Sequence, residues 1–339
     1  LLGAAPGAGG TFEKYDDTGG LLLNGTLSTP RSMHTATLLQ SRTVFAAGGE
    51  SDTTSWQIFD QNGNVVNSGL LNSGRSSSVA TLLANGNVFL AGGLTGIPSV
   101  GSQTWEIRNP DGGLVSSGNL NDVRGSGASA VTLRNGNVWI SGGSIGTGGP
   151  CSYEIRDQNG GFVTSGILTS CFGGGQVQVL GNGNVMLLGG DNAPGTYEIR
   201  SQTGALVSTS SLVNAFNHGA NSVVLNNGNV FIFGSCQSCR TDEPDPKDPN
   251  HTLNNWNCGT LGATSTWEIR DISGNFVATG SLLAQRDAAG AAVLSNGNVF
   301  ITGGNLALGS WEIRSPSGAL LSQGSLFNGD GGGHTLTHF

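Results

Sequence analysis

The sequence predicts an all-β fold, a seven-bladed β-propeller made of four-stranded antiparallel blades. Three observations predict it. A unit of about 40–50 residues recurs along the chain, Asn-Gly pairs recur within it between apolar stretches, and the two ends of the chain match complementary parts of one unit. Glycine supplies 58 of the 339 residues and charged residues only 11%, which is typical of many short strands joined by turns.

One leucine near the end of each unit marks the register of the repeat. These residues are Leu27, Leu71, Leu120, Leu168, Leu212, Leu282 and Leu326. Successive leucines lie 44, 49, 48, 44, 70 and 44 residues apart. Five intervals fit the length of a four-stranded blade, and the long one holds an insertion at about 235–266.

The first two strands of a unit, A and B, flank an Asn-Gly turn. In one unit, Ala80-Thr81-Leu82-Leu83 and Val88-Phe89-Leu90-Ala91 flank Asn85-Gly86. Asn-Gly tolerates positive φ at both central positions, as a type I′ hairpin requires. The same pair recurs at Asn135-Gly136, Asn182-Gly183, Asn227-Gly228 and Asn296-Gly297.

Strand C is the run that contains Trp-Glu-Ile-Arg or a close variant, as in Trp105-Glu106-Ile107-Arg108. Alternation in a strand predicts the aromatic residue and Ile on one face and Glu and Arg on the other. A second turn, such as Asp111-Gly112, leads into strand D.

The chain ends predict how the ring closes. Leu1-Leu2-Gly3 followed by Thr11-Phe12-Glu13 matches the end of a strand B followed by a strand C, and the segment from Gly333 to Phe339 matches a strand A. We therefore expect the C-terminal strand A to pair with the N-terminal B, C and D strands, which removes free sheet edges at the closure. Residues 1–339 then form a single propeller domain. A start at Leu1 rather than methionine suggests a processed or trimmed chain.

Gly-Gly doublets after strand B, the strand C aromatic and an arginine before strand A, as in Pro30-Arg31 and Gly74-Arg75, resemble kelch repeats. The resemblance covers essentially the whole chain and is nearest to bacterial secreted kelch propellers, within the galactose-oxidase-like propeller superfamily. One departure is that the usual Tyr-Asp of strand C is largely Ile-Arg here. Kelch propellers include enzymes, adhesins and scaffolds, so the resemblance implies the fold rather than the function.

The composition of the chain excludes some classes of binding partner. The formal net charge is −8 and only 14 residues are Lys or Arg, so the basic surface that nucleic acid requires is missing. No stretch approaches the about 18 apolar residues of a transmembrane helix. Scarce lysine and the cysteines favour an extracellular or cell-surface location.

A candidate ligand site follows from the position four residues after each marker leucine. Around the ring these residues are Arg31, Arg75, Arg124, Phe172, Phe216, Arg286 and Asp330. They are expected near the central mouth, on the face that carries the B–C and D–A connections, where they would bind a carboxylate or a sugar. Alternatively, the arginines bind carbonyl groups at strand ends of the neighbouring blade and have an architectural role.

Glu and Arg recur together in strand C of five blades: Glu106/Arg108, Glu154/Arg156, Glu198/Arg200, Glu268/Arg270 and Glu312/Arg314. Paired carboxylates serve acid–base catalysis when their environments differ. Repetition at equivalent places instead favours salt bridges between blades or on the surface.

The cysteines give two further hypotheses. Cys151 and Cys171 are expected on one face of adjacent blades and predict a disulfide. In the insertion, Cys236, Cys239 and Cys258 with His251 would hold zinc, or Cys258 would pair with Cys236 or Cys239 in an oxidising compartment. The acidic run Asp242, Glu243, Asp245 and Asp248 is a candidate for calcium binding, and no other cofactor is expected.

Copper-radical oxidases share the propeller resemblance, and their chemistry needs a cross-linked Cys–Tyr pair, a second tyrosine and two histidines. No such pattern converges in the sequence around Tyr15, Tyr153 or Tyr197. A Gly-x-Ser-x-Gly element for a hydrolase is also missing. The first hypothesis for function is therefore a non-enzymatic extracellular propeller for recognition or adhesion, with a carbohydrate or protein ligand. The alternatives are a structural subunit that assembles into a filament or coat, and an enzyme with an unrecognised site.

Overall fold

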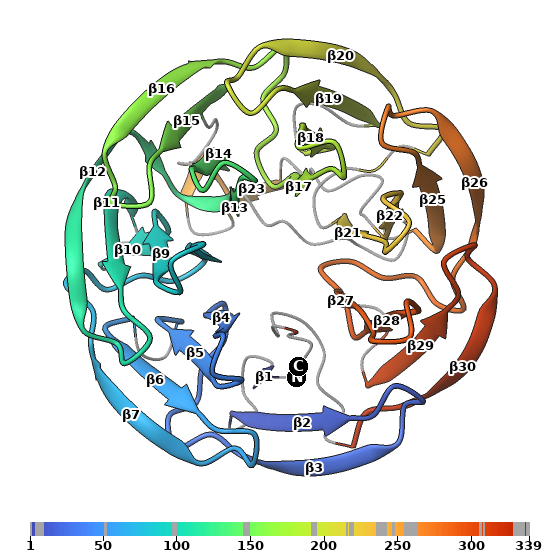
Figure 1. The fold of residues 1–339 in the computed structure, drawn as a ribbon, viewed down its shortest axis with the longest axis horizontal. Helices are drawn as coiled ribbons and strands as arrows, with labels where there is room; N and C mark the ends of the chain where they lie inside the picture. Colours follow the sequence, from blue (N-terminus) through green and yellow to red (C-terminus); the bar gives the residue numbers. More distant parts are fainter. Residues whose placement is uncertain are drawn as a thin grey trace.

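Short antiparallel strands follow one another around a ring in the computed structural model (Figure 1). The structure describes residues 2–3, 10–50, 53–96, 100–144, 150–190, 195–214, 216, 220–234, 243–245, 248–253, 264–304, 307, 309–327 and 336. Among these residues no helix is long and apolar enough to cross a membrane.

Six sheets have the predicted four strands, A to D from the centre outward (Figure 1). In the first half they are β4 (Thr35–Leu38), β5 (Val44–Ala47), β6 (Ser55–Phe59) and β7 (Val65–Leu70); β8 (Val79–Leu82), β9 (Val88–Ala91), β11 (Val100–Arg108) and β12 (Leu114–Arg124); and β13 (Ser126–Thr132), β14 (Val138–Ser144), β15 (Ser152–Arg156) and β16 (Phe162–Ile167). In the second half they are β17 (Gln176–Val179), β18 (Val185–Leu188), β19 (Thr196–Arg200) and β20 (Leu206–Ser211); β21 (Asn221–Val224), β22 (Val230–Phe233), β25 (Thr266–Arg270) and β26 (Phe276–Ser281); and β27 (Gly290–Val293), β28 (Val299–Thr302), β29 (Ser310–Arg314) and β30 (Leu320–Ser325).

The remaining strands form smaller units. β1 (Leu2–Gly3), β2 (Thr11–Tyr15) and β3 (Leu21–Thr26) make a three-stranded sheet. β10 (Leu94–Thr95) adds to β11, and β23 (Glu243–Asp245) pairs with β24 (Asp248–Leu253) inside the insertion. The structure thus shows six four-stranded blades where the sequence predicts seven. The strand predicted to complete the β1–β3 sheet, in 333–339, falls outside the described residues except for Leu336.

Strand B is buried along its length, as in β9 and β22, because neighbouring blades cover both faces of each sheet. Within most blades an aromatic ring of strand B stacks on the aromatic residue of strand C. Phe45 lies 5.5 Å from Trp56 and Phe89 lies 5.7 Å from Trp105, measured between ring centroids. These stacks form the apolar layer between adjacent blades.

The turn between strands C and D locks each blade to the one before it. Gly160 has φ +90°, and a Cβ placed there would lie 2.0 Å from the ring of Trp105 in the preceding blade. The same contact recurs around the ring as Gly19–Trp311, Gly63–Phe12, Gly112–Trp56, Gly204–Tyr153, Gly274–Tyr197 and Gly318–Trp267. The contacts of Gly19 and Gly63 show that the β1–β3 sheet sits between the last and first four-stranded blades and closes the ring.

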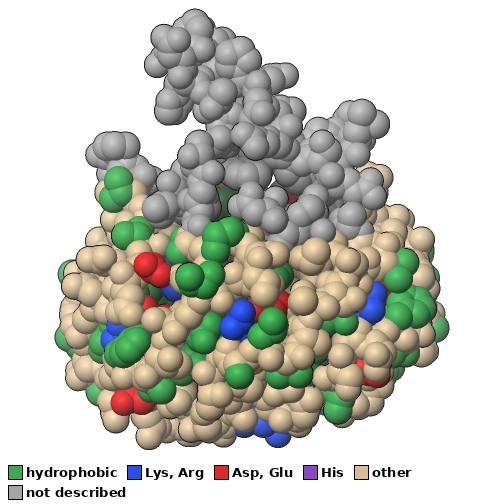
Figure 2. All heavy atoms as spheres, turned by 90° about the horizontal axis from the view of Figure 1, so that it is seen from above, with side chains coloured by type: hydrophobic (Ala, Val, Ile, Leu, Met, Phe, Trp, Pro, Cys, Tyr) green, Lys and Arg blue, Asp and Glu red, His purple; other side chains and the backbone are tan. Residues whose placement is uncertain are grey.

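Figure 2 shows the side of the resulting disc, on which hydrophobic side chains are spread among polar ones and charged side chains are few. We call the disc face with the B–C and D–A connections the loop face. The opposite face, which carries the A–B and C–D turns, is the turn face.

Candidate functional site

The predicted arginine ring lies at the loop face but is buried. Arg31, Arg75, Arg124 and Arg286 are each at most 1% exposed. Each guanidinium donates to two backbone carbonyls that flank the B–C connection of its own blade. For Arg75 these are Gly92 O at 3.0 Å and Thr104 O at 3.1 Å.

The backbone of the same arginines joins neighbouring blades. The carbonyl of Arg75 accepts a hydrogen bond from Gly49 N at 3.0 Å, and that of Arg124 accepts one from Gly93 N at 2.8 Å. Both donors belong to the Gly-Gly doublet of the preceding blade, where a side chain would collide with this backbone. A Cβ on Gly48, for example, would lie 2.1 Å from Arg75 O. This explains why the doublet and the arginine recur together.

Burial lowers the pKa of Arg75, Arg124 and Arg286, and nearby Glu106, Asp122 and Glu312, respectively, oppose that shift. The carboxylates of Glu106 and Glu312 lie 3.2 and 3.1 Å from Arg75 and Arg286. The arginines thus bind carbonyls at strand ends, as the architectural alternative expects, but these carbonyls belong to their own blade rather than to the neighbouring one. Ligand binding by the ring stays a prediction.

The remaining ring positions differ from the arginines. Phe172 and Phe216 are 3% and 1% exposed, and each packs in an apolar cluster between blades. Asp330 lies outside the described residues. Six of the seven predicted positions are therefore buried, four as arginines hydrogen-bonded to backbone carbonyls and two as phenylalanines in apolar clusters.

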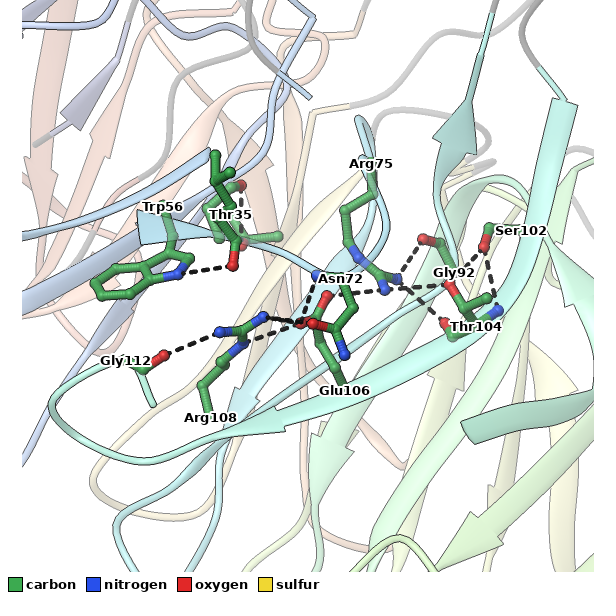
Figure 3. A network of polar contacts seen from close by, with 12 residues as sticks. Thr35, Trp56, Asn72, Arg75, Gly92, Ser102, Thr104, Glu106, Arg108 and Gly112 are labelled. Carbon is green, nitrogen blue, oxygen red and sulfur yellow. Dashed lines mark hydrogen bonds and ion pairs between the residues drawn. The ribbon is translucent and has the colours of Figure 1, made fainter. Parts of the chain in front are cut away.

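The Glu/Arg pairs of strand C are buried interblade networks rather than surface ladders (Figure 3). Glu106 is 0% exposed and accepts from Arg108 Nη2 at 2.6 Å. Besides Arg108 and Arg75, Glu106 accepts from the backbone N–H of Asn72, 3.2 Å away in the preceding D–A connection. Arg108 also donates to Gly112 O, in the turn that packs on Trp56.

The other carboxylates repeat this arrangement, so each ties strand C of one blade to the D–A connection of the blade before it. The carboxylate of Glu154 accepts from Asn121 N at 2.8 Å, and that of Glu198 accepts from Thr169 N at 3.0 Å. Phe327 N donates to Glu13 at 3.3 Å, which connects the last blade to β2. Acid–base catalysis uses two carboxyl groups whose environments differ. Here the carboxylates have equivalent environments, and each is held by hydrogen bonds.

The predicted disulfide is confirmed: Cys151 is bonded to Cys171, with Cα atoms 4.2 Å apart. Cys151 precedes β15 in a B–C connection, and Cys171 follows β16 in a D–A connection. The bond therefore fastens two neighbouring loops on the loop face.

We expect the double substitution Cys151→Ser/Cys171→Ser to lower the free energy of unfolding by about 3 kcal/mol, from the entropy of the closed loop. The bridged residues are 20 apart in sequence. Urea unfolding of the oxidised protein and the variant measures the difference. The control variant Ser129→Ala removes one side-chain hydrogen bond, from Ser129 to Gly175 O, and no covalent link. Equal stability of the oxidised protein and the double variant would contradict the expectation.

The insertion lies between β22 and β25 and thus on the loop face. Its described part is the β23–β24 hairpin and residues 264–266, and the hairpin includes the backbone of Glu243, Asp245 and Asp248. Cys236, Cys239, Cys258 and Asp242 lie outside the described residues, as do the side chains of the three acidic residues. Among the residues that the structure describes, no three His, Cys, Asp or Glu side chains gather as metal ligands do.

All three tyrosines of the chain occupy interblade positions. The hydroxyl of Tyr153 donates to Gly204 O at 3.2 Å, and that of Tyr197 donates to Gly274 O at 3.0 Å. Both acceptors lie in C–D turns, on the turn face, and Tyr15 donates to Glu13 at the ring closure. With its tyrosines held in this way, the chain does not fit a site that needs two tyrosine ligands for copper.

Three exposed apolar side chains on the loop face were not predicted from the sequence. Val213, Leu283 and Phe327 are 64%, 53% and 67% exposed, and we call them the apolar arc. They lie on the D–A connections of three consecutive blades. Equivalent positions elsewhere are polar: Ser28, Asn72, Asn121 and Thr169. An apolar residue at a repeat position that is otherwise polar is the sequence signal for this arc.

Comparison with known proteins supports the fold alone. No protein-family model and no curated protein matches the chain. A fungal alcohol oxidase of the AA5 family, in complex with copper, has a similar structure, with a TM-score of 0.63 and 16% identity over 87% of this chain and 66% of that chain. A protein of unknown function from Bacteroides caccae matches with a TM-score of 0.47 and 14% identity, over 83% and 93% of the two chains. The first match places the chain among β-propellers, and neither match assigns a function.

Proposed function

We propose that this chain is a non-enzymatic recognition or adhesion domain of the extracellular space or cell surface, which binds a protein or glycan through its loop face. The apolar arc is the observation that carries the proposal. The arc repeats an exposed apolar side chain on one face of three consecutive blades. Exposed apolar surface that gathers on one face marks interaction sites, and aromatic residues such as Phe are enriched at protein interfaces. Val213 and Leu283 are aliphatic, which favours a protein ligand over a sugar.

The backbone at or beside each arc residue donates a hydrogen bond to a buried carboxylate. Leu283 N donates to Glu312, and Phe327 N donates to Glu13 and to the hydroxyl of Tyr15. Asn214 N, next to Val213, donates to Glu268 at 3.0 Å. Loops held by hydrogen bonds lose less conformational entropy on binding. The turn face, in contrast, repeats the same Gly-containing turns from blade to blade.

We expect Phe327→Ala to weaken ligand binding at least tenfold, which corresponds to about 1.4 kcal/mol. The experiment applies the full chain to arrays of glycans and of extracellular proteins, then titrates the bound ligand against the variant. Phe162→Ala is the matched control, because Phe162 is also exposed, at 53%, but lies on the outer strand β16. Equal weakening by both variants, or none by Phe327→Ala, would reject the arc as the binding site.

We further propose that the propeller is related to kelch proteins, because its blades carry Gly-Gly doublets, a strand C aromatic residue and an arginine before strand A. The β1–β3 sheet would become a seventh four-stranded blade by addition of a C-terminal strand near Leu336. In support, Leu336 packs against the cluster that contains Leu294, Phe300 and Trp311.

A further inference from the structure

The outermost strand of each sheet pairs with a neighbour on one side only. β7 pairs with β6 and β16 pairs with β15, and no strand of the described residues covers their outer edges. Figure 1 shows these strands on the circumference of the ring. An open edge presents unpaired N–H and C=O groups that can pair with a strand of another chain.

Two features that normally protect such edges, charged side chains and proline, are missing from β7 and β16. Their sequences, Val-Val-Asn-Ser-Gly-Leu and Phe-Val-Thr-Ser-Gly-Ile, contain no Lys, Arg, Asp, Glu or Pro. Charged side chains and proline are the usual barriers to edge pairing. Six uncharged residues rich in β-branched and apolar side chains are well suited to strand addition.

β7 and β16 also differ from the other outer strands. Val66 and Leu70 are 56% and 69% exposed, and Val163 and Ile167 are 47% and 79% exposed. Residues four apart in a strand lie on one face, so each edge has an apolar side chain near both ends of its exposed face. The residue equivalent to Leu70 and Ile167 is polar in the other outer strands: Thr26, Asn119, Ser211, Ser281 and Ser325.

We propose that the chain associates with further copies of itself through the outer edges of β7 and β16. Charge favours this occupant. Copies with a net charge of −8 repel one another, so they meet best where charged side chains are missing. A strongly charged partner would find no complementary charge on these edges. The side of the disc that faces the viewer in Figure 2 carries few charged side chains.

Each edge is self-complementary. A two-fold axis perpendicular to the sheet pairs β16 antiparallel with β16 of a second copy. Such an axis can pass midway between the two strands at Ser165, so that the Ser165 residues of the two copies lie opposite each other. Val163 then lies opposite Ile167 of the second copy, and Ile167 lies opposite its Val163, so apolar pairs flank the axis on both sides. Around Ser68, the same operation pairs Val66 with Leu70.

Two such edges on one molecule lead to open growth. β7 and β16 belong to blades separated by one blade, so a copy joined through β16 leaves both β7 edges free. The result is a chain of copies rather than a closed dimer. This inference is independent of ligand binding at the loop face.

Sedimentation velocity and electron microscopy of the full chain, from about 1 to 100 µM as a range for moderate affinities, test the proposal. Species larger than dimers are expected for the unmodified protein. Ile167→Lys alone is expected to stop growth at dimers joined through β7. Leu70→Lys with Ile167→Lys is expected to give monomers. The matched control, Ser211→Lys with Ser281→Lys, adds the same charge at equivalent exposed positions and should leave growth intact.

A cross-link provides a second measurement that does not depend on destabilising the contact. Ser165→Cys is expected to form an intermolecular disulfide under mild oxidation, because the two Ser165 residues lie at the axis. Thr209→Cys, at the equivalent position of β20, should not. A monomer at all concentrations, growth that survives the double lysine substitution, or equal cross-linking of both cysteine variants would overturn the proposal.

Discussion

Glu154→Gln is expected to lower the free energy of unfolding by about 3 kcal/mol, because it leaves a buried guanidinium without its counter-charge. Glu154 is 0% exposed and pairs with Arg156, whose other hydrogen bonds go to the backbone carbonyls of Asn119 and Gly160. These neutral carbonyls do not replace the carboxylate. Chemical unfolding of the purified variant measures the loss.

The protein itself contains the uncharged counterpart of this pair. In β6 the equivalent residues are Gln57 and Phe59, both buried. In this blade, uncharged residues thus take the place of both the glutamate and the arginine. We therefore expect Glu154→Gln/Arg156→Phe to be more stable than Glu154→Gln alone, with a coupling of about 2 kcal/mol between the two positions.

A double-mutant cycle supplies the measurement, with Asp111→Asn as the control for removal of an exposed carboxylate. That control should change stability by less than about 0.5 kcal/mol. Additive effects at Glu154 and Arg156 would show that the pair does not act as a unit.

Gly160→Ala is expected to destabilise the fold by about 4 kcal/mol. About 1–2 kcal/mol comes from placing an L-residue at positive φ, and the remainder from forcing Cβ into Trp105, as overpacking of a filled site does. Gly136→Ala is the matched control. Gly136 has φ +85°, and a Cβ added there would meet nothing within 4 Å.

The difference between the two alanine variants isolates the contact between blades from backbone strain. Gly136→Ala should cost about 1–2 kcal/mol from strain alone. Thermal unfolding of both variants under the same conditions provides the comparison. Equal destabilisation would mean that Trp105 yields without loss, and the turn glycines would then serve only the backbone.

The strand order of a blade is predictable because its signals are local. Asn85-Gly86 encodes a hairpin by its own backbone preference, and the following Val88–Ala91 reads as a strand without reference to distant residues. The predicted disulfide was also correct, because connectivity alone places Cys151 and Cys171 on one face.

The environment of a side chain depends on residues that lie far away in sequence. Alternation correctly separates Trp105 from Glu106 across the two faces of β11, but it does not reveal that the two neighbouring blades cover both faces. Arg75 illustrates the same limit, because an arginine beside a predicted mouth is equally compatible with solvent and with buried carbonyl partners. Its hydrogen bonds to Gly92 and Thr104 depend on the exact approach of two strand ends. The count of four-stranded blades likewise depends on pairing between the two chain ends.

The hydrogen bond between Phe327 and Glu13 has a consequence for the order of folding. Its partners are 314 residues apart in sequence, whereas the equivalent Thr169–Glu198 contact joins residues 29 apart. Loop closure at the longer separation costs about 2 kcal/mol more, and long-range contacts slow the search for the native state. During synthesis, β2 has to wait for the last outer strand to leave the ribosome before it can gain this neighbour. Nascent chains should therefore hold several docked blades while the circle is still open, and protease sensitivity at the β2 sheet should disappear only once Phe327 has left the ribosome.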